Sequence, residues 1–319
     1  MQSQFPISRR SVVKRGLAGA VGIALGVGCS DSLLLAAETA SKLPLITKPI
    51  PSSGERLPVV GLGTNAYSVA TAEEIAARKE VLQHFPELGA KVIDTARGYG
   101  DSELVIGKLL AELGNRDKIF LATKTPMRGE LKPGNGELEE ALARLQTKRI
   151  DLLQIHNFNN IEQLFPLLQQ WKKDGKVRYI GVTTSTNNQY PQLADAIRML
   201  PLDFIQVDYS IDNRDAADEI LPLAQDKGLA VLGNVPLGGR RGSVLTKVAD
   251  KPLPPWAADI DVTSWAQLLL KYNISHPALT AVIPGTTKLS HLVDNQLAAR
   301  GRLPDAAMRK KIEQYWESV

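Results

Sequence analysis

The sequence DLLQIHNFNNIEQLFPLLQQWKKDGKVRYIGV, residues 151–182, contains a pattern that indicates the fold class. Residues 151–155 form a short, mostly apolar run that is typical of a buried strand. Residues 161–173 repeat apolar side chains at helical spacing, and residues 177–182 are again mostly apolar. A strand, a helix and a second strand in this order predict one parallel crossover unit, because parallel strands are joined through helices.

Outward from this unit the same alternation runs through nearly the whole chain. We expect strands at residues 59–64, 91–94, 118–123, 151–155, 177–182, 204–207, 229–232 and 280–283. We expect helices at residues 72–88, 103–113, 136–146, 161–173, 192–199, 216–227, 262–272, 289–299 and 305–318. Eight strand–helix units predict a single (β/α)8 TIM barrel over residues 56–319. The alternative is an open, doubly wound sheet of two domains, which Gly61-Leu62-Gly63 disfavours because no third glycine completes a dinucleotide-binding loop.

Two segments interrupt the alternation. Residues 235–260 hold four prolines and four cations without a clean period, so we expect a long loop there. Residues 38–55 are rich in proline, serine and lysine, and they predict a linker with a short hairpin around Ser52-Ser53-Gly54. We therefore expect a hairpin before the barrel and a long loop after its seventh strand.

The first 37 residues resemble an export signal rather than part of a domain. Arg9 and Arg10 lie in a basic segment, and a weakly apolar run over residues 16–28 follows. This run is too short for a membrane-spanning helix, which needs about 20 residues. The layout resembles a cleavable twin-arginine (Tat) signal, with a cleavage point after Ala37 and a periplasmic destination. The alternatives are an amphipathic or disordered tail, and a membrane lipoprotein attached through Cys29, which Gly26 disfavours because a large apolar residue is expected there.

The composition excludes several classes of protein. A chain with 44% hydrophobic and 23% charged residues is not disordered or fibrous. One cysteine and four scattered histidines allow neither a disulfide framework nor a familiar metal motif, so no metal is expected. The net charge of +4 suggests a nucleic-acid or membrane partner, but residues 1–37 contain four cations and one acid. The remaining 282 residues therefore carry only +1, and we expect neither nucleic-acid binding nor stable membrane insertion.

Polar side chains gather at the carboxyl ends of three neighbouring strands. Asp94 ends the second predicted strand, with Tyr99 five residues later. Lys124 follows the third strand and His156 follows the fourth. In an eight-unit barrel these ends meet at one rim, where catalytic groups lie. Each residue alone has a structural explanation, as a helix cap, a solvated cation or a core histidine, but the four together predict an active site.

These four residues, in this order, resemble the tetrad of the aldo-keto reductase family. Further segments match that family in order, namely Gly61-Leu62-Gly63-Thr64, Asp94-Thr95-Ala96, residues 175–182, Gln206-Val207-Asp208-Tyr209, Ile283-Pro284-Gly285 and Asp294-Asn295. The resemblance implies an NAD(P)-dependent oxidoreductase that interconverts a carbonyl and an alcohol. Tyr99 would supply the proton, Lys124 would favour the phenolate, Asp94 would pair with Lys124, and His156 would orient the carbonyl oxygen.

The resemblance also implies a nicotinamide cofactor, NADP in preference to NAD. The expected contacts are Gly63, Thr64, Thr183, Thr184, Gln206, Asn234, Leu237, Gly238, Arg240, Gly285, Thr286, Thr287, His291 and Asn295. Three departures from the family pattern occur among them. Thr183-Thr184 replaces a Ser-Asn pair, Asn234 replaces an aromatic residue that stacks on nicotinamide, and Gly285 and His291 replace a Lys and an Arg. Arg240 would close over the pyrophosphate with Arg241, or the two are a solvated surface pair.

Two kinds of function fit these observations. The first is an exported enzyme that acts on a small carbonyl or alcohol and meets the Tat machinery, as a monomer or small homo-oligomer. The second is a weakly active or non-catalytic nicotinamide-binding sensor or regulatory subunit. The intact tetrad favours the enzyme, and the replaced cofactor contacts leave the second reading open.

Overall fold

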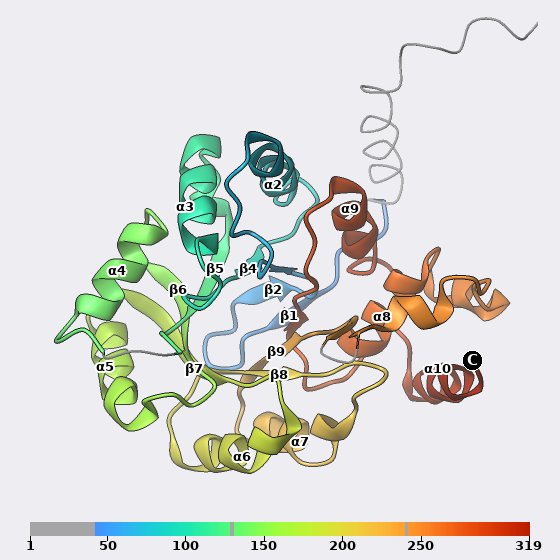
Figure 1. Cartoon of the computed structure of the whole chain (residues 1–319). Coiled ribbons are helices and arrows are strands. Elements are labelled where there is room, and N and C mark those ends of the chain that lie inside the picture. Colours follow the sequence, from blue (N-terminus) through green and yellow to red (C-terminus); the bar gives the residue numbers. More distant parts are fainter. Residues whose placement is uncertain (1–41, 128–130, 240–241) are drawn as a thin grey trace, which may run out of the picture.

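Eight short parallel strands lie side by side at the centre of the computed structural model, which describes residues 42–127, 131–239 and 242–319 (Figure 1). In spatial order they are β3 (Leu62–Gly63), β4 (Val92–Asp94), β5 (Phe120–Lys124), β6 (Ile150–His156), β7 (Val177–Thr183), β8 (Phe204–Asp208), β9 (Ala230–Asn234) and β12 (Ala281–Val282). Parallel bridges between Val60 and Val282 and between Gly63 and Gly285 join the first strand to the last. The sheet therefore closes, and the predicted (β/α)8 barrel is confirmed.

Helices surround this barrel (Figure 1). They are α2 (Ala72–His84), α3 (Ser102–Leu113), α4 (Gly136–Arg144), α5 (Ile161–Lys173), α6 (Tyr190–Met199), α7 (Ile220–Asp226), α8 (Trp265–Ile274), α9 (Leu289–Leu297) and α10 (Ala306–Ser318). Most of the predicted ranges agree, and the largest differences lie at helix ends. Helix α2 ends four residues early, at His84. Phe85 still has helical backbone and its amide bonds the carbonyl of Val81, but Pro86 has no amide to continue the helical hydrogen bonds. Helix α8 begins three residues late because the Ser264 hydroxyl caps it by accepting from the amide of Gln267.

The predicted long loop after β9 contains short ordered elements. Two strands of two residues each, β10 (Gly238–Gly239) and β11 (Gly242–Ser243), pair antiparallel. Two 3-10 helices follow, η4 (Val244–Val248) and η5 (Pro255–Ile260). These elements bury Val248 and Ile260 in the outer core, so the segment is anchored to the barrel.

A hairpin of β1 (Thr47–Pro49) and β2 (Arg56–Pro58) lies across the barrel in Figure 1. It extends past the predicted boundary at residue 56. Its side chains Ile50 and Leu57 are fully buried in the interior cluster, with Phe120 and Phe204 from the starts of two barrel strands. The hairpin thus closes the end of the barrel at which the strands begin.

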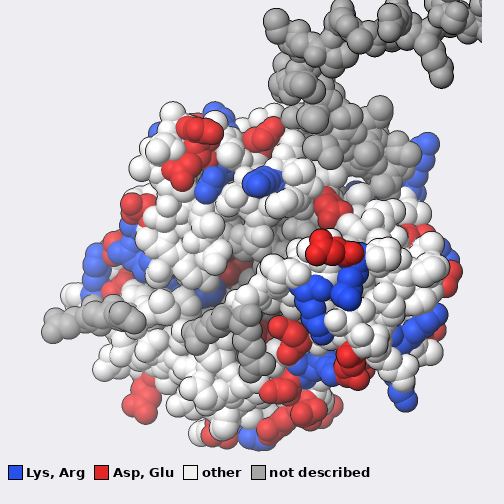
Figure 2. Space-filling view, turned by 45° about the vertical axis from the view of Figure 1, so that its right-hand side comes forward, with Lys and Arg blue, Asp and Glu red and all other residues white. Residues whose placement is uncertain are grey.

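The surface of the described structure is mixed in charge. Figure 2 shows Lys and Arg interspersed with Asp and Glu over the face it presents. Within the described ranges, no helix has the length and hydropathy needed to cross a membrane. The predicted export signal with Arg9, Arg10 and Cys29 lies outside the described residues, and so does the predicted cofactor contact Arg240.

Candidate active site

Three adjacent strands place the tetrad at one rim of the barrel. Asp94, Lys124 and His156 are the last residues of β4, β5 and β6. These strands pair in parallel and in sequence, so their carboxyl ends meet. Tyr99 follows β4 in a turn in which its amide bonds the carbonyl of Ala96 at 3.0 Å. All four predicted catalytic residues line the same cleft.

The Lys124 ammonium is held by two acceptors. Its Nζ lies 2.5 Å from Asp94 Oδ2 and 2.8 Å from the carbonyl oxygen of Thr95. The Lys124 and Asp94 side chains are only 2% and 3% exposed. Burial alone would lower the pKa of Lys124, but Asp94 and Tyr99 raise it overall. The Lys124 ammonium therefore carries its positive charge under the rim in a nearly dry environment.

The Tyr99 ring lies close to both this cation and the histidine. Lys124 Nζ is 5.2 Å from the ring centroid of Tyr99. The rings of Tyr99 and His156 meet edge to face, with centroids 6.1 Å apart. Tyr99 is half-buried, whereas Lys124 is buried beneath it, so the phenol is the part of this group that a substrate can reach.

His156 is neutral at ordinary pH. Burial, and then the charge of Lys124, lower the pKa of His156 to about 3. Its Nδ1 is buried and has no hydrogen-bond partner within the described part of the chain. The backbone is fixed separately, because the His156 amide donates to Thr125 Oγ1 at 3.2 Å. A neutral imidazole can donate a hydrogen bond to a carbonyl oxygen and leave the transfer of a proton to another group.

The cleft beyond the tetrad has a volume of about 1240 Å³. Ten predicted cofactor residues are described and line it, namely Gly63, Thr64, Thr183, Gln206, Asn234, Leu237, Gly238, Gly285, His291 and Asn295. The other three described ones, Thr184, Thr286 and Thr287, are not part of the lining. The cleft thus runs from the tetrad to the start of α9.

Local hydrogen bonds explain why some predicted hydroxyls do not face the cleft. Thr184 Oγ1 donates to Gln189 Oε1 at 2.6 Å, inside its own loop. Thr286 Oγ1 accepts from the amide of Lys288 at 3.2 Å. Thr183 does reach the cleft, but its hydroxyl donates to Gln206 Oε1 at 2.8 Å.

Sequence reasoning missed a polar group on the β7–β8 side of the cleft. Asp208 ends β8, is buried, and accepts from the Tyr190 hydroxyl at 3.0 Å and from Asn213 Nδ2 at 2.5 Å. Burial raises the pKa of Asp208. Asn187 joins this group through reciprocal amide bonds of 3.1 Å with Asn213. Because Asp208 ends an apolar strand, the sequence could have indicated it as a rim residue. Asn187 and Asn213 lie in the connections that follow β7 and β8, where no sequence pattern indicates their position.

No group of three or more His, Cys, Asp and Glu side chains that could hold a metal occurs in residues 42–127, 131–239 and 242–319.

The chain is similar to proteins of a known family. Residues 59–317 match the model of the aldo/keto reductase family. The aldo-keto reductase YhdN of Bacillus subtilis is 32% identical over 191 residues, which are 54% of this chain and 56% of that one, so the match spans little more than half of that relative. The aldo-keto reductase str7 of Strobilurus tenacellus is 30% identical over 290 residues, 78% of this chain and 84% of that one.

A solved structure agrees in fold. An aldo/keto reductase of Klebsiella pneumoniae, in complex with NADP and acetate, superposes with a TM-score of 0.65 over 82% of this chain and 93% of that one, at 24% identity. The family match covers the whole barrel and all four tetrad residues. The expected enzyme class is confirmed, and the chain belongs to the aldo/keto reductase family.

Proposed function

We propose that this protein is an exported, NADP(H)-dependent oxidoreductase that interconverts a carbonyl compound and an alcohol, with Tyr99 as the general acid and base. One observation carries this proposal. The dehydrated Lys124–Asp94 pair lies against the only half-buried member of the tetrad, the Tyr99 phenol. A structural ion pair does not need a phenol poised over it, whereas a proton donor of this kind does.

Tyr99 gives its proton to the carbonyl oxygen while a hydride reaches the carbonyl carbon. The cofactor supplies that hydride when it is bound. The carbon–oxygen double bond becomes a single bond, the product is an alcohol, and the Tyr99 phenolate takes a proton back from water. Lys124 stabilises the phenolate formed in this step, and Asp94 keeps Lys124 charged.

His156 positions the substrate. Because its imidazole is neutral, it donates a hydrogen bond to the carbonyl oxygen and holds that oxygen toward Tyr99. Withdrawing electron density from the carbonyl in this way also favours attack at carbon.

The cleft fits a dinucleotide. Its volume suits a ligand of that size, and the buried Oδ1 of Asn234 has no partner among the described residues. Asn234, Thr183 and Gln206 would hold the carboxamide end, and Gly285, His291 and Asn295 would hold the adenosine end near α9. NADP is favoured because the related Klebsiella protein carries it. A lower dissociation constant for NADPH than for NADH is expected, and tighter NADH binding would reverse the preference.

A substrate panel tests the activity. Aldehydes, sugars and quinones should be offered with NADPH, and its oxidation followed by absorbance. We expect turnover of at least one class. Tight nucleotide binding without turnover would instead support the alternative function, a nicotinamide-binding sensor or regulatory subunit. Asn234 keeps that alternative open because it stands where the family has an aromatic residue.

Export through the Tat route belongs to the same proposal and rests on Arg9 and Arg10. We expect the full-length protein in the periplasm and the Arg9→Lys, Arg10→Lys variant in the cytoplasm, as detected by fractionation and immunoblotting. Equal distribution of both proteins would contradict it. Since Tat carries folded proteins, protein purified from the periplasm is also expected to retain nucleotide.

A further inference from the structure

A second cavity lies at the opposite end of the barrel from the tetrad. Its volume is about 740 Å³, and residues that directly precede β4, β5 and β6 line it. Six Lys and Arg side chains and three carboxylates contribute to its wall. The six cations are Lys91, Arg116, Lys118, Lys148, Arg149 and Arg178.

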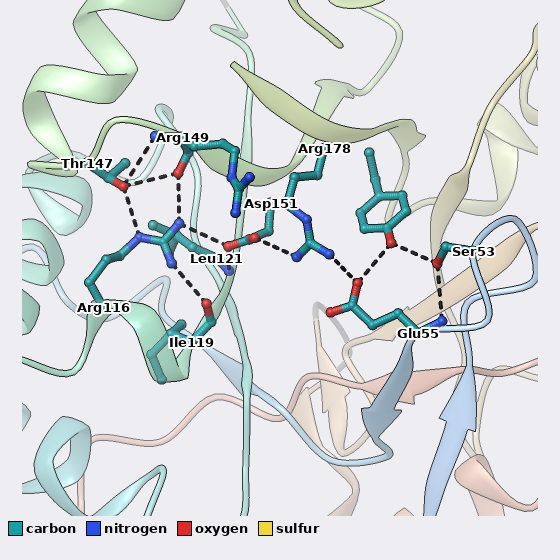
Figure 3. A network of polar contacts seen from close by, with 10 residues as sticks. Ser53, Glu55, Arg116, Ile119, Leu121, Thr147, Arg149, Asp151 and Arg178 are labelled. Carbon is teal, nitrogen blue, oxygen red and sulfur yellow. Dashed lines mark hydrogen bonds and ion pairs between the residues drawn. The ribbon is translucent and has the colours of Figure 1, made fainter. Parts of the chain in front are cut away.

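Two of these cations are neutralised within a network that Figure 3 shows. Arg116 and Arg178 flank Asp151, each with a nitrogen 2.9 Å from one of its carboxylate oxygens. Arg178 also pairs with Glu55 of the β1–β2 hairpin. Asp151 accepts a further bond from the amide of Leu121 at 2.9 Å. This network is satisfied internally and forms a firm wall for the cavity.

The remaining four cations have no such partners. Lys91, Lys118, Lys148 and Arg149 are exposed, and their side chains form no hydrogen bond or salt bridge with any described residue. The one lining carboxylate outside the network is Asp117. Because the strands that they precede are adjacent and parallel, the four residues line the same cavity.

We propose that this cavity binds a phosphate-bearing polyanion. Lysine offers a point charge and arginine a planar pair of donors, and both match phosphate oxygens. The volume lies in the range of small-molecule sites and exceeds what one phosphate fills. Four like charges around one cavity repel each other, and a multivalent anion relieves that repulsion. The charged lining disfavours an apolar occupant.

This chemistry has two possible sources, a soluble polyphosphate compound or the headgroups of an anionic lipid surface. Both offer the same phosphate oxygens to Lys148 and Arg149. Neither source touches the catalytic rim, so binding here is separate from carbonyl reduction.

Isothermal titration of the full chain with sodium tripolyphosphate tests the soluble source. The Lys148→Glu, Arg149→Glu variant is expected to bind at least tenfold more weakly than the unmodified protein. The control Lys173→Glu, Lys227→Glu makes the same charge change at exposed positions outside the cavity. It is expected to stay within threefold, and affinity for the unmodified protein should fall as salt is raised.

Co-sedimentation with phosphatidylglycerol and phosphatidylcholine vesicles tests the lipid source with the same proteins. The neutralising variant Lys91→Gln, Lys118→Gln should weaken binding several-fold in whichever arm responds, and it covers the case in which charge reversal impairs folding. Binding of tripolyphosphate that depends on the cavity identifies a soluble anion. Binding confined to phosphatidylglycerol and dependent on the cavity identifies a headgroup. Binding to neither probe, or binding equal in all variants, overturns the proposal.

Discussion

The two ends of the barrel use the same three strands in opposite ways. At their carboxyl ends, β4, β5 and β6 carry Asp94, Lys124 and His156, which are all buried, and Lys124 pairs directly with Asp94. Just before their starts lie Lys91, Lys118 and Arg149, which are exposed. Burial shifts the pKa values of the first set, whereas the second set lies exposed around the cavity. The rim is therefore suited to proton transfer, whereas the opposite end of the barrel, called the base below, is suited to binding.

The sharpest way to break this contrast is to remove the buried cation. Lys124→Met leaves Asp94 buried without its partner, which should lower the free energy of unfolding by about 3–5 kcal/mol. Carbonyl reduction should fall by about 10³-fold because Tyr99 loses its neighbouring charge. Urea denaturation and steady-state kinetics measure the two effects.

The double variant Asp94→Asn, Lys124→Met serves as the control for that experiment. It removes both charges, so it should be more stable than Lys124→Met alone while remaining inactive. If the single variant is as stable as the unmodified protein, the pair is not the dehydrated unit described here.

The base should respond to mutation in stability but not in activity. Asp151→Asn takes the shared carboxylate from Arg116 and Arg178 and should cost about 2–3 kcal/mol in unfolding free energy, since both bonds involve charged groups. The rate constant for reduction should stay within twofold. A large loss of activity at unchanged stability would show that the two ends are coupled.

Acid should lower the free energy of unfolding through protonation of His156. Its pKa is about 3 in the folded protein, against a reference value of 6.5 for histidine. Between these values the unfolded chain binds a proton that the folded protein does not, so stability falls as pH falls. At pH 5 this amounts to about 2 kcal/mol relative to neutral pH. Between pH 7 and pH 5, the His156→Gln variant should lose about 2 kcal/mol less unfolding free energy than the unmodified protein, as measured by denaturation at both pH values. The same pH dependence in both proteins would refute the low pKa of His156.

Backbone strain gives the smallest expected difference. Val235, at the rim, has a φ of 51°, and Gln146, at the base, has a φ of 47°. A β-branched side chain tolerates this region worse than an unbranched one. Val235→Gly should therefore raise the free energy of unfolding by about 1 kcal/mol, and Gln146→Gly should leave it nearly unchanged. Equal shifts in thermal denaturation would remove this difference between the ends.

The sequence predicted the barrel and the tetrad because both leave strong local patterns. Alternating apolar runs and helical periods mark the eight units, and Asp94, Lys124 and His156 each end an apolar strand. The base cavity left no such mark, since exposed cations such as Lys91 and Lys118 look like solvated charges until their strands are known to be neighbours. The turning of Thr184 toward Gln189 likewise depends on a loop conformation that no periodicity specifies.

Proton transfer by Tyr99 at the rim can be tested with the Tyr99→Phe variant. The phenyl ring keeps its place near Lys124 and His156 but has no proton to give. We expect kcat for the best substrate of the panel to fall by about 10³-fold, while the dissociation constant for NADPH, measured by fluorescence titration, stays within twofold. Reduction at the rate of the unmodified protein would rule out Tyr99 as the proton donor.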